Sequence, residues 1–138
     1  MATKPKNPLA LARQVLDIEL AGLKAVRSQL DGQFANAVEM LAKAMSRRNK
    51  LVVVGIGKSG DIGKKITATF NSTGATSVLL DPANALHGDI GLLDDGDVVL
   101  ALSYSGESDE LLNLLAAIKK FPVQIMAFTG SPKSTLAR

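Results

Sequence analysis

The chain has 138 residues, of which 46% are hydrophobic, enough to bury the core of a single domain and too apolar for a disordered tail or a coiled coil. It contains no cysteine and one histidine, which excludes a disulfide framework and a thiolate or ordinary histidine zinc site, so no metal is expected. The 16 basic and 13 acidic residues give a net charge of +3 spread along the chain, which favours neither nucleic acid nor a membrane as a partner.

The first eight residues, MATKPKNP, lack the apolar core of a signal peptide. No later stretch reaches the roughly 18 uninterrupted apolar residues that a membrane-spanning helix requires. We therefore expect a disordered leader at residues 1–8 and a cytoplasmic protein.

Residues 9–48 space their apolar side chains as α-helices do. The pattern is interrupted near Asp31 and Gly32, so it predicts a pair of N-terminal helices. Each helix carries an apolar stripe that needs a partner surface. We expect these helices to pack on their own domain or on a neighbouring subunit.

From residue 49 onward the pattern becomes strand, glycine loop and helix, repeated. Four short apolar runs without polar alternation are typical of strands covered on both faces. Helices are predicted between them at residues 62–71 and 110–120, with a shorter turn-like piece at 84–92. This order predicts an α/β fold over residues 49–138, a three-layer sandwich around a parallel, doubly wound sheet. The predicted strands span residues 51–54, 77–80, 98–102 and 123–128.

Ligands of such sheets bind outside the carboxyl ends of the strands. The loops that follow the four predicted strands should therefore meet at one site. A further helix is predicted to start after the last loop, with Ser131 as its N-cap and Pro132 in its first position. The converging loops are residues 55–61, 81–91, 103–109 and 129–134.

The first of these loops, Gly55-Ile56-Gly57-Lys58-Ser59-Gly60, follows a strand and opens a helix. Its Gly-Lys-Ser sequence is the end of a P-loop, but a P-loop also needs a glycine where this chain has Val52, inside the strand, so this interpretation is excluded. The same residues form the Gly-x-Gly-x-x-Gly pattern of a dinucleotide site, with Asp81 as the ribose-binding acid. That dinucleotide-binding alternative stays open.

A pocket for a single phosphate ester is the third interpretation of the glycine loop. Backbone N–H groups, a helix N-terminus and the hydroxyl of Ser59 can all donate to a phosphate. The loop after the third strand adds Ser103, Ser105 and Ser108 around Gly106. One serine alone would be explained as a helix cap, whereas three, with Ser59 in the facing loop, favour an anion pocket.

Four motifs in this order resemble the sugar isomerase (SIS) domain, and more narrowly the arabinose 5-phosphate isomerases of lipopolysaccharide and capsule synthesis. The resemblance implies a flavodoxin- or Rossmann-like α/β fold without a cofactor. It also implies the interconversion of D-arabinose 5-phosphate and D-ribulose 5-phosphate, an aldose–ketose isomerisation through an enediol. The motifs are Gly57-Lys58-Ser59-Gly60, Ala68-Thr69-Phe70-Asn71-Ser72-Thr73-Gly74, His87-Gly88-Asp89-Ile90-Gly91 and Ser103-Tyr104-Ser105-Gly106-Glu107-Ser108-Asp109-Glu110.

The resemblance also implies roles for individual residues. Glu110 is expected to transfer the proton or orient the sugar, Lys58 to supply positive charge, and His87 to assist ring opening or proton transfer. The residues expected to bind the phosphate or the adjoining hydroxyls are Gly57, Ser59, Gly60, Ser103, Ser105, Gly106 and Ser108.

Relatives of this kind are expected to continue beyond the equivalent of Arg138, with a last strand, further catalytic residues and a pair of CBS domains. They also commonly form homo-oligomers, either dimers or tetramers. The chain departs from the family pattern at Asp61 and Tyr104, where a histidine and an asparagine are usual. A non-catalytic phosphosugar sensor built on the same domain is the alternative function; it would need the serines but neither Glu110 nor His87.

Overall fold

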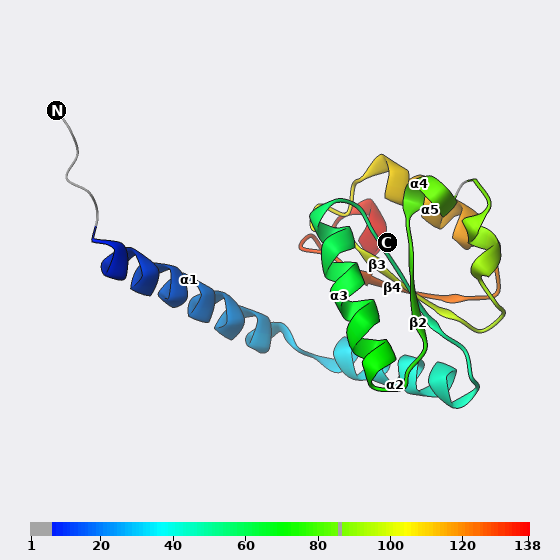
Figure 1. The fold of residues 1–138 in the computed structure, drawn as a ribbon, viewed down its shortest axis with the longest axis horizontal. Helices are drawn as coiled ribbons and strands as arrows, with labels where there is room; N and C mark the ends of the chain where they lie inside the picture. The colour runs from blue at the N-terminus through cyan, green and yellow to red at the C-terminus, as the bar shows by residue number, and fades with distance from the viewer. Residues whose placement is uncertain (1–6, 86) are drawn as a thin grey trace. The chain divides into compact units, whose positions relative to one another are not determined.

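The computed structural model describes residues 7–85 and 87–138. It has an α/β fold around a four-stranded, all-parallel sheet with the strand order β2-β1-β3-β4 (Figure 1). The chain divides into two compact units, the first ending at Asn36 and the second spanning Ala37–Arg138. The elements are α1 Pro8–Gln29, α2 Gly32–Ser46, β1 Leu51–Gly55, α3 Lys58–Ser72, β2 Ser77–Leu80, α4 Pro82–Ala85, η1 Asp89–Leu92, β3 Val98–Leu102, α5 Asp109–Ile118, β4 Gln124–Phe128 and η2 Thr135–Ala137, where η marks a 3-10 helix.

Helices cover both faces of the sheet, which is the middle layer of three (Figure 1). Alternate residues of each central strand point to opposite faces. Val52 and Val54 of β1 pack in a cluster with α5, whereas Leu51 and Val53 pack with α2 and α3. Every residue of β1 and β3 is buried. This two-sided burial explains the unbroken apolar runs and confirms the predicted fold class.

Polar side chains cap the two N-terminal helices. Asn7 accepts a hydrogen bond from the backbone N–H of Leu9 (3.1 Å) and caps α1, which Pro8 opens. Leu30 is extended, and the carboxylate of Asp31 then accepts from the N–H of Gln33 (2.8 Å) at the start of α2. The predicted break near Asp31 is confirmed. Of the leader expected at residues 1–8, residues 1–6 lie outside the described part of the chain. No helix of the described part is long and apolar enough to cross a membrane.

Two differences from the sequence prediction bear on the site. Helix α3 begins at Lys58 rather than residue 62, because Gly57 adopts a positive φ of 55° and turns the chain directly from β1 into the helix. The prediction that a helix starts after Ser131 is wrong. Residues 131–134 form a turn, closed by the N–H and hydroxyl of Ser134 donating to the carbonyl of Ser131 (3.1 and 2.7 Å). The short η2 begins only at Thr135, with Ser134 at its N-cap position but without a side-chain cap among the described residues.

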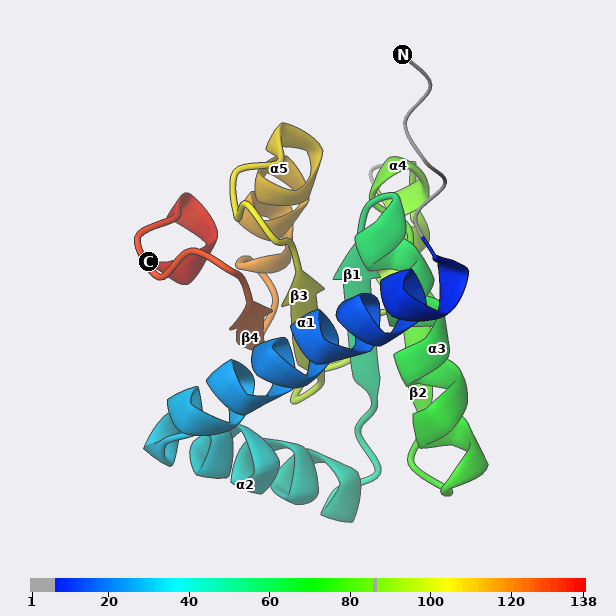
Figure 2. The same ribbon diagram turned by 90° about the vertical axis from the view of Figure 1, so that its left-hand side faces the viewer.

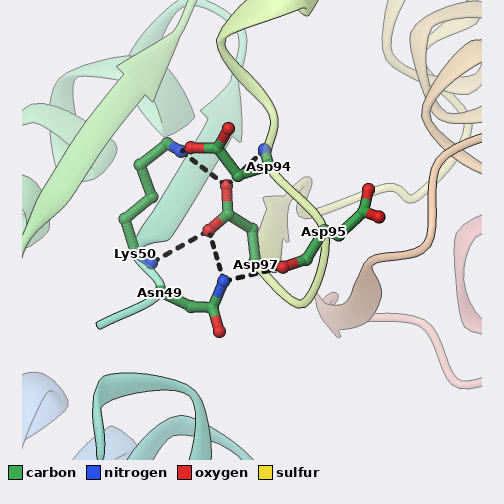
Figure 3. Close-up of polar contacts among 5 residues, drawn as sticks. All are labelled: Asn49, Lys50, Asp94, Asp95 and Asp97. Carbon is green, nitrogen blue, oxygen red and sulfur yellow. Dashed lines mark hydrogen bonds and ion pairs between the residues drawn. The ribbon is translucent and has the colours of Figure 1, made fainter. Parts of the chain in front are cut away.

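A buried carboxylate joins the amino ends of the two central strands (Figure 3). Asp97, which is fully buried, precedes β3 and accepts a hydrogen bond from the backbone N–H of Lys50, immediately before β1 (3.0 Å). Its other oxygen accepts from the N–H of Asp94 (2.9 Å) and pairs with the Lys50 ammonium at 2.7 Å. The amide of Asn49 bridges to the same loop through the carbonyl of Asp95 (2.8 Å). These bonds fix the register between β1 and β3 where both strands begin.

The pKa values of this pair shift in the directions that keep both groups charged. Burial by itself would raise the pKa of Asp97, but the hydrogen bonds and the charge of Lys50, together with the N–H of Asp94, hold it below its ordinary value. Burial would likewise lower the pKa of Lys50, and the hydrogen bonds and charges of Asp94 and Asp97 raise it instead. The ion pair therefore persists over the whole range between the two ordinary pKa values.

We expect Asp97→Asn to lower the free energy of unfolding by about 3 kcal/mol, because it leaves the buried end of Lys50 without its inner partner. The control is Asp94→Asn, since the Asp94 side chain is 79% exposed and its loss should cost less than about 1 kcal/mol. Urea unfolding of the three proteins measures both values. Equal losses in the two variants would contradict the role given to Asp97.

The same pair predicts how stability depends on pH. A carboxyl group with a lowered folded-state pKa contributes stability above its ordinary pKa of about 3.9, and that contribution is lost as the pH falls through the folded-state value. The difference in unfolding free energy between wild type and Asp97→Asn should therefore be constant from about pH 7 to pH 5 and shrink below about pH 4. A difference that stays constant to the acid end of the titration would refute this assignment.

Candidate functional site

The carboxyl ends of all four strands lie at one edge of the sheet, because every strand pair is parallel. In Figure 2 the arrowheads of β1 and β3 point toward the same edge. Gly55 at the end of β1 is in register with Leu102 at the end of β3. The glycine loop and the serine loop, residues 103–108, thus leave adjacent strands at the same level, as the sequence predicts.

The glycine loop is shaped by a close approach between β1 and the first turn of α3. A Cβ atom on Gly55 would lie 2.9 Å from the carbonyl carbon of Ser59, and one on Gly60 would lie 2.9 Å from the carbonyl oxygen of Gly55. Only glycine fits at these two positions. As a result Lys58 and Ser59 belong to the first helical turn, with Lys58 exposed and Ser59 half-buried.

The three serines of the serine loop hydrogen-bond to the loop itself. Ser103 is buried, and its hydroxyl accepts from the N–H of Gly106 (3.0 Å) and lies 3.5 Å from the hydroxyl of Ser108. Ser105 accepts from the N–H of Glu107 (3.3 Å). Ser108 occupies the N-cap position of α5, but among the described residues its side chain caps no helical N–H. The first N–H groups of α5 are thus left without a serine cap, although the hydroxyls of Ser108 and Ser103 lie close to this helix end.

The segment after β4 braces the serine loop. Gly106 has a positive φ of 69°, and a Cβ atom there would collide with the side chain of Ser134 and lie 2.9 Å from the hydroxyl of Thr129. The carbonyl of Gly106 accepts from the N–H of Leu136 (3.1 Å). The N–H of Thr135 donates to the carboxylate of Glu107 (2.8 Å). These contacts tie the serine loop to the segment after β4.

Hydrogen bonding by Thr135, through its side chain and its backbone N–H, holds the pKa of the Glu107 carboxyl below its ordinary value. Glu107 is therefore an ionised acceptor within the brace. Its carboxylate is engaged by Thr135, whereas Glu110, three residues on, lines a pocket.

That pocket, of about 300 Å³, opens between the ends of β1 and β2 and the start of α5. Of the residues singled out from the sequence, it brings together Gly57 and Glu110. Asp81, which the sequence suggested only for a dinucleotide site, and Asn113, which it did not suggest, also face the pocket. Asn113 follows Glu110 by three positions on α5, so helical periodicity was the signal that could have found it. The lining is Ile56, Gly57, Asp81, Pro82, Ala83, Glu110 and Asn113.

Asp81 is held in place by the short helix that follows β2. One of its carboxylate oxygens accepts hydrogen bonds from the N–H groups of Ala83 (2.9 Å) and Asn84 (3.3 Å). The carboxylate thereby caps α4, with Pro82 at the first helical position. Its orientation toward the pocket follows from these two bonds.

Lys58 and His87 are close in sequence to residues that line this pocket, but neither of them lines it. Lys58 follows Gly57, a lining residue, and is exposed. His87 is exposed in the turn after α4, where its backbone N–H donates to the carbonyl of Asn84 (2.9 Å). In the part of the chain that the structure describes, no three His, Asp or Glu side chains gather as a metal site would need.

The fold and this edge define a doubly wound α/β protein whose ligand-facing loops carry glycines, serines and carboxylates. Residues 44–138 match the model of the SIS domain, and the chain belongs to the SIS domain family. Membership confirms the family identified from the four sequence motifs.

Two curated relatives of the chain are named as arabinose 5-phosphate isomerases. The chain is 39% identical over 127 residues to arabinose 5-phosphate isomerase KdsD of Francisella tularensis, which covers 92% of this chain and 39% of that protein. It is 42% identical over 126 residues to KdsD of Salmonella typhi, covering 91% of this chain and 38% of that protein. The chain thus spans about two fifths of the length of these curated relatives.

Among solved structures, the chain resembles the protein c3406 of E. coli CFT073 in complex with A5P. The two share 36% sequence identity with a TM-score of 0.76, over 95% of this chain and 70% of that one. The similarity therefore extends over the sheet, the glycine loop and the serine loop.

We expect Gly106→Ala to destabilise the chain by about 3 kcal/mol, because it combines an unfavourable positive φ with overpacking against Ser134. Gly74→Ala is the matched control. Gly74 also has a positive φ, of 84°, but none of the described residues comes within 4 Å of a Cβ atom there, so only the backbone cost of about 1 kcal/mol applies. Urea unfolding compares the two. Equal costs would show that the contact with Ser134 does not constrain the loop.

Proposed function

We propose that this chain forms the phosphosugar-binding part of an aldose–ketose isomerase that interconverts D-arabinose 5-phosphate and D-ribulose 5-phosphate. The observation that carries the proposal is the place of Glu110. Its carboxylate lines a pocket and stands in the first turn of α5, directly after the serine loop. A base and an anion site are thus presented by one short segment, as an isomerase of a phosphorylated sugar requires.

In the proposed complex the phosphate lies against the serine loop. Ser103, Ser105 and Ser108 would donate hydroxyl hydrogen bonds, and the N-terminus of α5 would add backbone N–H groups and a favourable dipole. The glycine loop, with Gly57, Ser59 and Gly60, would approach from the neighbouring strand. The braced conformation of Gly106 supports this assignment, because a preformed anion site costs little ordering on binding.

The reaction needs one carbon-bound proton to move. A proton leaves C2 of the open-chain aldose and returns to C1, while a second proton moves from O2 to O1, which gives the ketose. We assign the transfer of this proton from C2 to C1 to the carboxylate of Glu110. Lys58, in the first turn of α3, would stabilise the negative charge that develops on the enediol oxygens. His87 would assist ring opening or move the proton between the oxygens.

A non-catalytic phosphosugar-binding domain is the second candidate function. The hydrogen bonds that shape the serine loop involve neither Glu110 nor His87, so the loop would keep its shape in a domain that binds phosphate without catalysis. The expected cytoplasmic location, the homo-oligomer and the domain division at residue 48 stay predictions. Light scattering of the purified chain tests the oligomeric state.

For the isomerase, we expect Glu110→Gln to slow the exchange of the C1 proton of ribulose 5-phosphate with deuterated water by about a thousandfold, since amides are poor bases. Asp109→Asn is the control, because Asp109 is exposed in the same helical turn and is absent from the pocket lining. It should keep the wild-type rate, as followed by NMR. Binding of the sugar phosphate without any exchange in the wild type would favour the non-catalytic domain instead.

The phosphate assignment has its own test. The double variant Ser103→Ala with Ser105→Ala removes two hydroxyls and should weaken the binding of inorganic phosphate by about tenfold or more. Glu110→Gln should leave that affinity close to wild type. Calorimetry measures both, and a double variant that binds phosphate normally would exclude the serine loop as the anchor.

A further inference from the structure

We propose that Asn113 forms hydrogen bonds with the hydroxyl groups beside the reacting carbons of the sugar and thereby determines which pentose 5-phosphate the site prefers. This inference rests on the proposed function. Asn113 lies on α5 and lines the pocket together with Glu110. The pocket volume of about 300 Å³ is at the small end of ligand sites and suits a short polyhydroxylated chain.

The charges of the lining residues decide which end of the ligand enters the pocket. Asp81, which follows β2, and Glu110, on α5, both line it, and the residues that line it include no lysine or arginine. A phosphate group placed between two carboxylates would be repelled. Hydroxyl groups, in contrast, can donate hydrogen bonds to carboxylate oxygens. The pocket therefore takes the uncharged end of a sugar phosphate, and the phosphate stays at the serine loop.

Asn113 differs from the two carboxylates in what it offers a hydroxyl. A carboxylate accepts hydrogen bonds only, whereas the carboxamide of Asn113 both donates and accepts. It can therefore bind a hydroxyl as acceptor and as donor, which fixes the direction in which that hydroxyl points. A group of this kind distinguishes epimers better than a charge does, because a hydroxyl on the wrong side leaves the amide unpaired.

The helix that carries Asn113 is anchored on the sheet. Its neighbours Leu111, Leu114 and Leu115 are buried against the sheet, with at most 5% of their surface exposed. Asn113 is exposed on the opposite side of the helix, one turn beyond Glu110. Side chains three positions apart on a helix have Cβ atoms roughly 5–6 Å apart, so Asn113 reaches the carbons next to those at which Glu110 would act.

The experiment measures the affinities of the full chain for three ligands by calorimetry: arabinose 5-phosphate, its C2 epimer ribose 5-phosphate, and inorganic phosphate. We expect Asn113→Ala to weaken arabinose 5-phosphate binding by about tenfold and to bring the affinities for the two epimers together, with no change for inorganic phosphate. The matched control is Asn84→Ala. It makes the same chemical change at an exposed position of α4 that the pocket lining does not include, and all three affinities should stay as in wild type.

The variant remains folded because Asn113 is an exposed helical residue and alanine has the higher helix propensity; thermal unfolding verifies this. If Asn113→Ala binds both epimers as wild type does, the inference fails while the proposed function stands. If it weakens inorganic phosphate to the same extent as the sugars, Asn113 acts on the phosphate, and the inference fails as well. A wild-type chain that binds inorganic phosphate but neither sugar phosphate overturns the proposed function and the inference together.

Discussion

The carboxylate of Asp97 is the interaction on which the arrangement of the site depends, although it lies at the opposite edge of the sheet. It bonds to the backbone N–H and the ammonium of Lys50 and so fixes where β1 and β3 begin relative to each other. The register then runs unchanged from Leu51 and Val98 to Gly55 and Leu102. Because the glycine and serine loops start at those last two residues, a shift of β3 by one residue relative to β1 would displace the two loops from each other and turn the side chains of β3 to the wrong faces of the sheet.

The layers of the fold could be predicted from the sequence because the pattern of burial is simple. Strands covered on both faces have uninterrupted apolar runs, and those at residues 51–54 and 98–102 correspond to β1 and β3. Parallel strands joined by helices leave their loops at one edge, so the positions of Gly57 and Glu110 near one pocket follow from topology alone. The break at Asp31 was also evident, since a polar residue followed by glycine interrupts the helical stripe.

Other parts of the site depend on close approaches between segments far apart in the chain, which local patterns do not encode. The early start of α3 depends on the positive φ of Gly57 and is accompanied by the close approach of Gly60 to Gly55. The brace of the serine loop depends on Ser134, which fills the space beside Gly106. The segment after Ser131 has the residue types of a helix start. However, the hydroxyl of Thr129 accepts a hydrogen bond from the backbone N–H of Ser131 (3.2 Å), and a turn forms instead. Asn113 was missed because a single polar residue on an amphipathic helix is ordinarily a solvated one.

The all-parallel pairing of the sheet has a consequence for how the chain folds. Leu51 pairs with Ser77 on one side and with Val98 on the other, and Val98 pairs in turn with Gln124. Parallel strands cannot be joined by a tight hairpin. Each pairing of two strands in this sheet therefore has to close a long loop of chain before the first hydrogen bond between them can form. During synthesis β2 is made before β3, so one edge of β1 can pair first with β2 while its other edge stays unpaired until β3 has been made. Folding should accordingly be slow for a domain of this size, and its rate should be governed by the joining of β1 and β3.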